Sequence, residues 1–208
     1  MNKLKEYPTP FAGVSLGVGG ISAFWAAQFP YQSLSRSIGL CGAIIALCLL
    51  LPVIMKFIAY PGRLLADLQH PTVGSVVPTM AMSAMIISHT VGMYSTALAV
   101  IIWFTAIFFH ILFFSVFIYH RIRDFNLNQV VPSWFVPPIG IVVACLTVPE
   151  ASLLPLARVL LAFGIVSYLV LLPIVIYRLS LGEKVEDARK PTLAILAAPA
   201  SLTLAGYL

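Results

Sequence analysis

The sequence predicts an all-α integral membrane protein, and three observations support this fold class. Of the 208 residues, 61% are hydrophobic and 9% are charged, whereas a soluble domain carries about 25% charged residues. Long apolar segments run through the whole chain, and a spanning helix needs about 20 such residues. A Pro-Thr or Pro-Ser pair also recurs about every 60 residues, which indicates a repeat architecture.

Seven apolar segments are the predicted spanning helices: residues 11–29, 35–59, 72–93, 95–120, 132–148, 151–179 and 191–208. The odd-numbered segments open with the recurring pair, at Pro8-Thr9, Pro71-Thr72, Pro132-Ser133 and Pro191-Thr192. Proline suits the first turn of a helix because its missing N–H would be unpaired there. We expect one transmembrane domain over residues 1–208, with helical hairpins at 1–60, 61–124 and 125–180 and an unpaired seventh helix at 191–208.

The odd and even segments differ in bulk. The odd segments are rich in small residues and broken by Gly or Pro, whereas the even segments are bulkier. Eight aromatic side chains lie between residues 101 and 120, which is typical of a helix that faces lipid. The alternation predicts lean inner helices and bulky outer helices, joined in part by polar turns at residues 61–70 and 181–190.

The basic residues are distributed unevenly between the two predicted sides of the membrane. With a cytoplasmic N-terminus, ten of the 12 Lys and Arg residues fall on the cytoplasmic side and only Arg36 and Arg158 on the other. This asymmetry follows the positive-inside rule and predicts a bacterial cytoplasmic membrane protein with its N-terminus inside. Nucleic acid is not an expected partner, because its binding needs basic residues clustered on one face with stacking aromatics.

The sequence contains no constellation that indicates catalysis. All seven Asp and Glu residues lie outside the predicted spans, and no metal-ligand spacing or nucleophile–base pair is present. We therefore expect no catalytic residue, no metal site and no cofactor. A cation pathway would be expected to carry a ring of carboxylates, so their absence from the spans favours anions.

Small and kinked residues of the odd segments are the candidate pore lining. Gly13 and Gly17 form a GxxxG pair, which indicates either close helix packing or a pore wall, and on that helix alone packing is favoured. Ser75 and Thr79 lie on one hydroxyl stripe that faces a neighbouring helix or water. Prolines inside a span leave carbonyls unpaired, which is tolerated where the broken helix lines a water-filled cavity. The adjacent Pro137-Pro138 pair is the strongest local indication of a pore.

Two histidines are candidate titrating groups. His110 lies deep in the fourth segment, and ionisable groups at such depth are often functional. Against a transport role, no span offers it a carboxylate partner, so a neutral, hydrogen-bonded histidine is the favoured interpretation. His89 lies near the outer end of its segment and is interpreted as interfacial.

The four openings together are similar to those of a known transporter family. Tyr7-Pro8-Thr9-Pro10-Phe11-Ala12-Gly13, Leu16-Gly17 and Trp25 resemble the start of the tellurite-resistance/dicarboxylate transporter family, which includes TehA-like proteins, fungal malate transporters and plant slow anion channels. His70-Pro71, Pro132-Ser133 with Pro137, and Ala198-Pro199-Ala200 fit the same pattern. The resemblance covers essentially the whole chain.

The resemblance implies five helical hairpins around a pseudo-five-fold axis, with odd helices lining a central pore and even helices outside. The pore-lining residues expected on this basis and from the kinks are Phe11, Gly13, Gly17, Ser75, Pro78, Thr79, Pro137, Pro138 and Pro199. The family has ten helices, and the phenylalanine that blocks its pore lies on the ninth, so no residue here takes that role. We expect a fragment or a shortened member that does not conduct as a monomer.

The expected function is transport of small anions by a channel or a weakly coupled carrier, with C4-dicarboxylates or a role in tellurite resistance as the candidates. The N-termini of the odd helices converge at the cytoplasmic side, and helix N-termini favour anions. A proton-coupled dicarboxylate carrier using His110 or His89 and a non-transport seven-helix protein are the alternatives. The expected partners are small anions, the lipid bilayer and a second copy of the chain in a homo-oligomer.

Overall fold

The computed structural model describes residues 2–28 and 32–207, and every regular element in these ranges is a helix. Five helices are long and apolar enough to cross a membrane: Phe11–Gln28, Ser33–Ala59, Val73–Gly92, Thr96–Arg123 and Ala151–Leu181. A shorter apolar helical segment covers Pro132–Leu146. The prediction of an all-α membrane protein is therefore confirmed.

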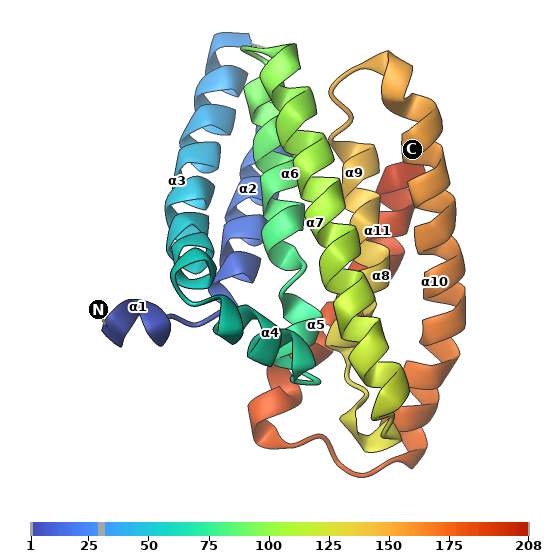
Figure 1. Cartoon of the computed structure of the whole chain (residues 1–208). Coiled ribbons are helices and arrows are strands. Elements are labelled where there is room, and N and C mark those ends of the chain that lie inside the picture. The colour runs from blue at the N-terminus through green and yellow to red at the C-terminus, as the bar shows by residue number, and fades with distance from the viewer. Residues whose placement is uncertain (1, 29–31, 208) are drawn as a thin grey trace.

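The first two long helices pack side by side. A short α1 (Asn2–Lys5) precedes α2 (Phe11–Gln28), and α3 (Gln32–Ala59) runs back alongside it (Figure 1). Gly42 of α3 lies directly against Ser22 of α2, so closely that a Cβ atom at Gly42 would overlap the Ser22 Cβ. The absence of a side chain at Gly42 is what allows the two backbones to approach.

The segment 61–70 is not a polar turn, and this expectation is wrong. Pro61 opens a helix, α4 (Pro61–Gln69), which lies across the lower end of the molecule in Figure 1 and buries Leu68. The third apolar segment then divides into α5 (Val73–Val76) and α6 (Thr79–Gly92). Ser95 accepts a hydrogen bond from the Leu98 amide and so caps the next helix, α7 (Thr96–Arg123).

The fifth segment is the most irregular part of the chain. After η1 (Leu127–Gln129) it passes through four short pieces: η2 (Pro132–Phe135), α8 (Val136–Ile139), η3 (Gly140–Val142) and α9 (Val143–Leu146). The chain continues through η4 (Ala151–Leu153), α10 (Leu154–Leu181), η5 (Asp187–Ala197) and α11 (Ala198–Tyr207).

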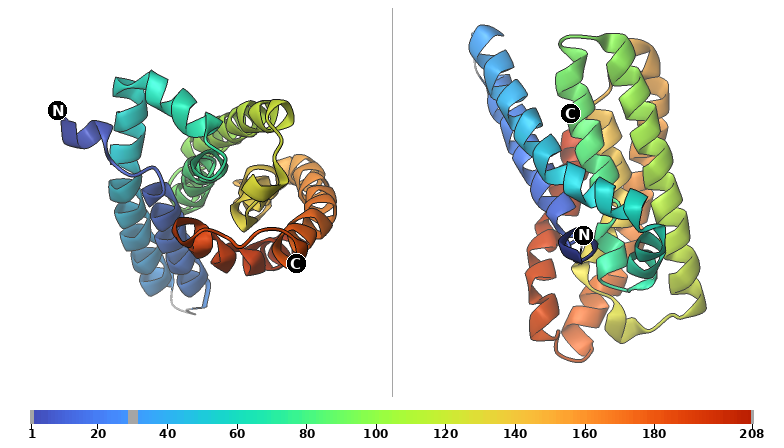
Figure 2. Two further views of the ribbon diagram at one scale, coloured as in Figure 1. Left: turned by 90° about the horizontal axis from the view of Figure 1, so that it is seen from below. Right: turned by 60° about the vertical axis from the view of Figure 1, so that its left-hand side comes forward.

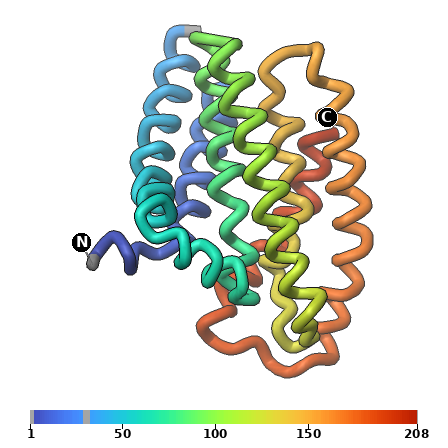
Figure 3. The backbone as a smooth tube through the Cα atoms, in the orientation of Figure 1, coloured from blue at the N-terminus to red at the C-terminus, as the bar shows by residue number. Residues whose placement is uncertain are grey.

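Two broken segments, α5–α6 and α8–α9, lie inside the arrangement together with the continuous α2, and the other long helices lie outside it. Seen from below, α2, α6 and the α8–α9 segment lie toward the centre, whereas α3, α7 and α10 lie at the periphery (Figure 2). Figure 3 traces the chain through these helices from the N-terminus to the C-terminus. Burial agrees for α6 and α10, since 67% of the most hydropathic stretch of Val73–Gly92 is buried and only 11% of that of Ala151–Leu181. It does not agree for α2, whose stretch is 22% buried against 28% for Ser33–Ala59. The continuous outer helices present their apolar side chains to lipid.

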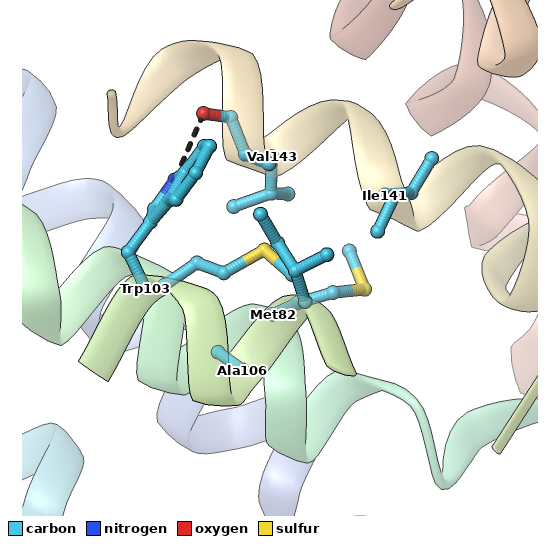
Figure 4. Packing of buried hydrophobic residues seen from close by; sticks show 8 residues of the cluster. Met82, Trp103, Ala106, Ile141 and Val143 are labelled. Carbon is cyan, nitrogen blue, oxygen red and sulfur yellow. Dashed lines mark hydrogen bonds between the residues drawn. The ribbon is translucent and has the colours of Figure 1, made fainter. Parts of the chain in front are cut away.

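The centre of the hydrophobic core joins α6, α7 and the α9 segment. Met82, Trp103 and Val143 come from these three elements and contact one another with Ala106 and Ile141 (Figure 4). Trp103 is completely buried, and its indole Nε1 donates a hydrogen bond to the Ala144 carbonyl at 3.1 Å. This bond satisfies the polar end of a side chain that otherwise contributes apolar area.

We predict that Gly42→Ala destabilises the protein, because rotation of the Ser22 side chain cannot move its Cβ out of the way. Overpacking of this kind costs about 1–3 kcal/mol. The matched control is Gly20→Ala on α2, where a Cβ would meet nothing within 4 Å and only the better helix propensity of alanine acts. Thermal unfolding in detergent should show a lower Tm for Gly42→Ala only, and equal Tm values would contradict the close approach.

Candidate functional site

The inner helix α2 has one packed face and one open face. Gly19 lies on the packed face, where a Cβ would come 3.0 Å from Ile86 Cγ2. Gly13 and Gly17 lie on the open face, where a Cβ would meet no described atom within 4 Å. The GxxxG pair is therefore not a packing contact among the described residues, and Phe11 on the same helix is 38% exposed. A pore wall formed by Phe11, Gly13 and Gly17 stays a prediction.

The break before α6 is closed by hydroxyl groups. The Ser75 hydroxyl is hydrogen-bonded to the Thr72 carbonyl at 2.7 Å and to Ser133 Oγ at 2.6 Å, and Thr79 donates to the Val76 carbonyl at 2.6 Å. Ser75, Pro78 and Thr79 are all buried. These hydroxyls therefore face neighbouring backbone and a neighbouring inner segment. Their contact with a permeating ion remains a prediction.

The break at Pro137-Pro138 is supported from outside by α7. The prolines have no N–H, so they cannot donate to the Ser133 and Trp134 carbonyls as residues of a continuous α-helix would. The Val136 amide bonds the Ser133 carbonyl instead. On the other side of the break, His110 Nε2 of α7 lies 2.8 Å from the Pro137 carbonyl oxygen, which it bonds as the donor. Two turns earlier on α7, Trp103 donates to the Ala144 carbonyl. A single face of α7 thus supplies side-chain donors to the broken segment.

This support was not predicted from the sequence. Trp103 and His110 are seven residues apart on one helix, and their acceptors at Pro137 and Ala144 are also seven apart. Residues at this spacing share a helix face. Two ring N–H donors seven residues apart on a mainly apolar helix were therefore the sequence signal for a hydrogen-bonding face. Their acceptors carry no sequence signature, because any residue has a backbone carbonyl.

His110 is 1% exposed, and its bond to Pro137 is the geometry expected for a neutral, hydrogen-bonded histidine. His89 is exposed in the last turn of α6, at the end of that helix that is farther from α4. The described residues do not bring the two histidines together, and a titrating role for either one stays a prediction.

The break at Pro199 lies beside the broken fifth segment. Pro199 is buried and shares a cavity of about 50 Å³ with Ile139 and Gly140 and with Met82 of α6. The break at Pro199 therefore lies next to the residues that follow Pro137-Pro138 and next to Met82, which follows the break at Pro78.

Basic side chains hold the end of the molecule where the odd segments begin. Lys56 is buried near the end of α3, and its ammonium donates to Asp67 Oδ2 at 3.1 Å, to Thr9 Oγ1 at 2.9 Å and to the Tyr7 carbonyl at 3.1 Å. Thr9 also donates to Asp67. The first Pro-Thr opening is thus joined to α3 and α4 through one buried ion pair.

The second and third openings are joined directly to each other. Trp134 Nε1 donates to the Pro71 carbonyl at 3.0 Å, next to the bond between Ser75 and Ser133. Arg121 bonds Gln129 and the Gln69 carbonyl, and Arg178 bonds the Asn128 carbonyl at 3.1 Å. The first three of the recurring Pro-Thr and Pro-Ser pairs therefore mark places where one end of an inner segment is bonded to its neighbours.

Comparison with known proteins adds a family match. Residues 6–208 match the family described as "SLAC1: Voltage-dependent anion channel". Two similar proteins of Methanocaldococcus jannaschii are the uncharacterized transporters MJ0762, 25% identical over 218 residues and 94% of this chain, and MJ0576, 29% identical over 174 residues and 72% of this chain. The aligned regions span 63% and 47% of those two proteins, so the chain covers less than two thirds of either relative.

We predict that Asp67→Asn lowers the stability of the protein, because it leaves the buried Lys56 ammonium without its carboxylate. Breaking a fully buried pair costs about 3–5 kcal/mol, and the loss here should be smaller because the Asp67 side chain is 21% exposed. Asp187→Asn is the control, since its partner Lys190 and Asp187 itself are largely exposed and such pairs contribute little. Thermal unfolding should separate the two variants, and a similar Tm for both would contradict a structural role for Lys56.

Proposed function

Because the chain belongs to the SLAC1 family of voltage-dependent anion channels, we propose that it forms the wall of a channel-like pathway for small anions across a membrane. The family match over residues 6–208 is the observation that carries this proposal. The names of the two relatives, both uncharacterized transporters, support transport rather than catalysis.

The electrostatics of the inner segments support an anion as the permeating species. The N-terminal ends of α2, α5, η2 and η5 all lie at the lower end of the molecule in Figure 1, where α4 and the 181–190 loop also lie. Helix N-termini carry partial positive charge and bind anions. No Asp or Glu occurs in the five spans or in the shorter apolar segment Pro132–Leu146 found among the described residues, so no carboxylate there opposes an anion.

We assign the wall of the pathway to the open face of α2, through Phe11, Gly13 and Gly17. The buried kinks behind it, at Ser75, Pro78, Thr79, Pro137, Pro138 and Pro199, give the inner layer its shape. An ion would meet bare backbone along the glycines, where no Cβ blocks its approach. Because the chain covers under two thirds of its relatives, we propose that further helices, from a longer polypeptide or a second copy, complete the pathway.

C4-dicarboxylates and tellurite-related oxyanions are the substrates that we propose within the anion class. A proton-coupled dicarboxylate carrier is the second candidate, because a buried histidine contacts the broken inner segment. Flux of labelled malate into proteoliposomes with and without a pH gradient distinguishes the two, since a passive channel responds only to the membrane potential and the anion gradient.

We predict that Gly17→Leu strongly reduces anion flux in proteoliposomes, because the new side chain would project from the open face of α2 into the pathway. Ala162→Leu is the matched control, since Ala162 is an exposed small residue on the outer helix α10. Both variants should insert and unfold like the parent protein. Ala162→Leu should keep the flux of the parent protein. Equal flux for Gly17→Leu and the parent would show that α2 does not line the pathway.

A second readout does not depend on flux. With Cys41, Cys48 and Cys145 replaced by alanine, a cysteine at position 17 should react with a small charged thiol reagent, and malate or chloride should slow the reaction. A cysteine at position 162 should stay unreactive because it faces lipid. Reaction at both positions, or at neither, would contradict a water-filled pathway along α2.

We also propose that the N-terminus is cytoplasmic, from the ten-to-two asymmetry of the basic residues. In the same cysteine-free background, Asn2→Cys should react in intact cells only with a membrane-permeant maleimide. Arg36→Cys should react with the impermeant reagent and serves as the control for the opposite side. Labelling of Asn2→Cys by the impermeant reagent would reverse the orientation.

A further inference from the structure

A crevice of about 310 Å³ lies on the outer surface between α7 and α10. Its sides come from Ile111 and Phe114 of α7 and from Val159 and Phe163 of α10, and its floor from Pro137 and Ile141 of the broken fifth segment. The Phe114 and Phe163 rings meet edge to face, with centroids 5.9 Å apart. The crevice thus passes between two outer helices and reaches the inner layer.

The crevice is mainly apolar, and one polar atom of its lining, the buried His110 Nδ1, has no hydrogen-bond partner among the described residues. Ser115 donates to the Ile111 carbonyl at 2.8 Å, and His110 Nε2 is bonded to the Pro137 carbonyl. A bound water needs two to four polar partners, and cavities lined by apolar side chains stay dry and take apolar molecules. His110 Nδ1 alone offers a water fewer partners than it needs, so an apolar molecule is the better occupant of this crevice.

The position of the crevice along the helices identifies its surroundings. Ile111 lies roughly 20 Å from either end of α7 at the rise of about 1.5 Å per residue, which places it within a hydrocarbon core about 30 Å thick. Ile111 is 47% exposed and Val159 64% exposed, so the sides of the crevice project toward the bilayer. The molecules that surround a spanning helix at this depth are lipid acyl chains.

We propose that this crevice binds one acyl chain of a bilayer lipid, which passes between α7 and α10 and contacts the floor at Pro137 and Ile141. An empty crevice would forfeit the dispersion contacts of its lining atoms, and an inserted hydrocarbon chain restores them. The bound chain would lie against the carbonyl that His110 holds, and so against the break in the fifth segment. The lipid site does not depend on the proposed anion pathway, because lipid binding can be measured without any measurement of anion flux.

The test uses the reconstituted protein and a phosphatidylcholine that carries a photoactivatable diazirine in the middle of one acyl chain. After irradiation, peptide mass spectrometry locates the adducts. Lipid that only surrounds the protein can label exposed residues such as Val159, Phe163 and Val166, whereas the floor residues Pro137 and Ile141 are buried beneath the sides of the crevice. We expect adducts on the floor as well as on the exposed residues.

Leu160→Trp is the variant that tests the crevice itself, since the larger ring would fill it. It should lose the floor adducts and keep those on exposed residues, while Leu169→Trp, an exposed position on the same helix, should keep both sets. Adducts confined to exposed residues in the parent protein would overturn the proposal without any variant. Reaction of Ile141→Cys with a water-soluble thiol reagent would also overturn it, by showing a water-filled side passage.

Discussion

The central constraint on this structure is that every backbone carbonyl freed by a proline must find a donor where no water is present. The inner segments are broken at Pro78, at Pro137-Pro138 and at Pro199, and each break removes one or two amide donors. The Ser133 and Ile195 carbonyls, four residues before Pro137 and Pro199, accept instead the amides of Val136 and Ala198. Nearby carbonyls accept side-chain donors, from Thr79 within the third segment and from His110 and Trp103 on the neighbouring outer helix. Without them, the unpaired carbonyls would cost several kcal/mol each.

This requirement explains why the outer helix α7 has two different faces. The aromatic run of α7 presents Phe104 and Phe108 outward but turns Trp103 and Phe117 inward. One face of the helix therefore meets hydrocarbon, and the other supplies hydrogen bonds and packing to two inner segments. Basic side chains supply hydrogen-bond donors to the connecting segments at the end where the odd segments begin. Lys56, Arg121 and Arg178 bond backbone carbonyls there.

Much of the fold follows from the sequence, because hydropathy and the recurring proline pairs are local signals. The predicted third segment at 72–93 is found as Val73–Gly92 and the fourth at 95–120 as Thr96–Arg123. The 61–70 helix was missed because its polar, amphipathic sequence reads as a turn when only apolar runs are counted.

Long-range partners were harder to predict than the elements themselves. Gly13 and Gly17 match a packing motif, yet Gly19 and Gly42 are the glycines where α2 approaches α6 and α3 closely. Sequence spacing identifies a bare helix face but does not say which neighbour it meets. For the same reason, the candidate pathway residues are recognisable as small or kinked, while their exposure to an ion depends on how the inner helices are arranged.

The matched spacing of Trp103 with His110 and of Ala144 with Pro137 has a mechanical consequence. Two bonds seven residues apart on antiparallel segments resist sliding of one segment along the other. A slide of even one residue, about 1.5 Å, would break both bonds at once. α7 and the broken fifth segment are thereby held in register along the helix axis. A displacement of α7 relative to the fifth segment that keeps both bonds must then be a small rotation or tilt and not a slide.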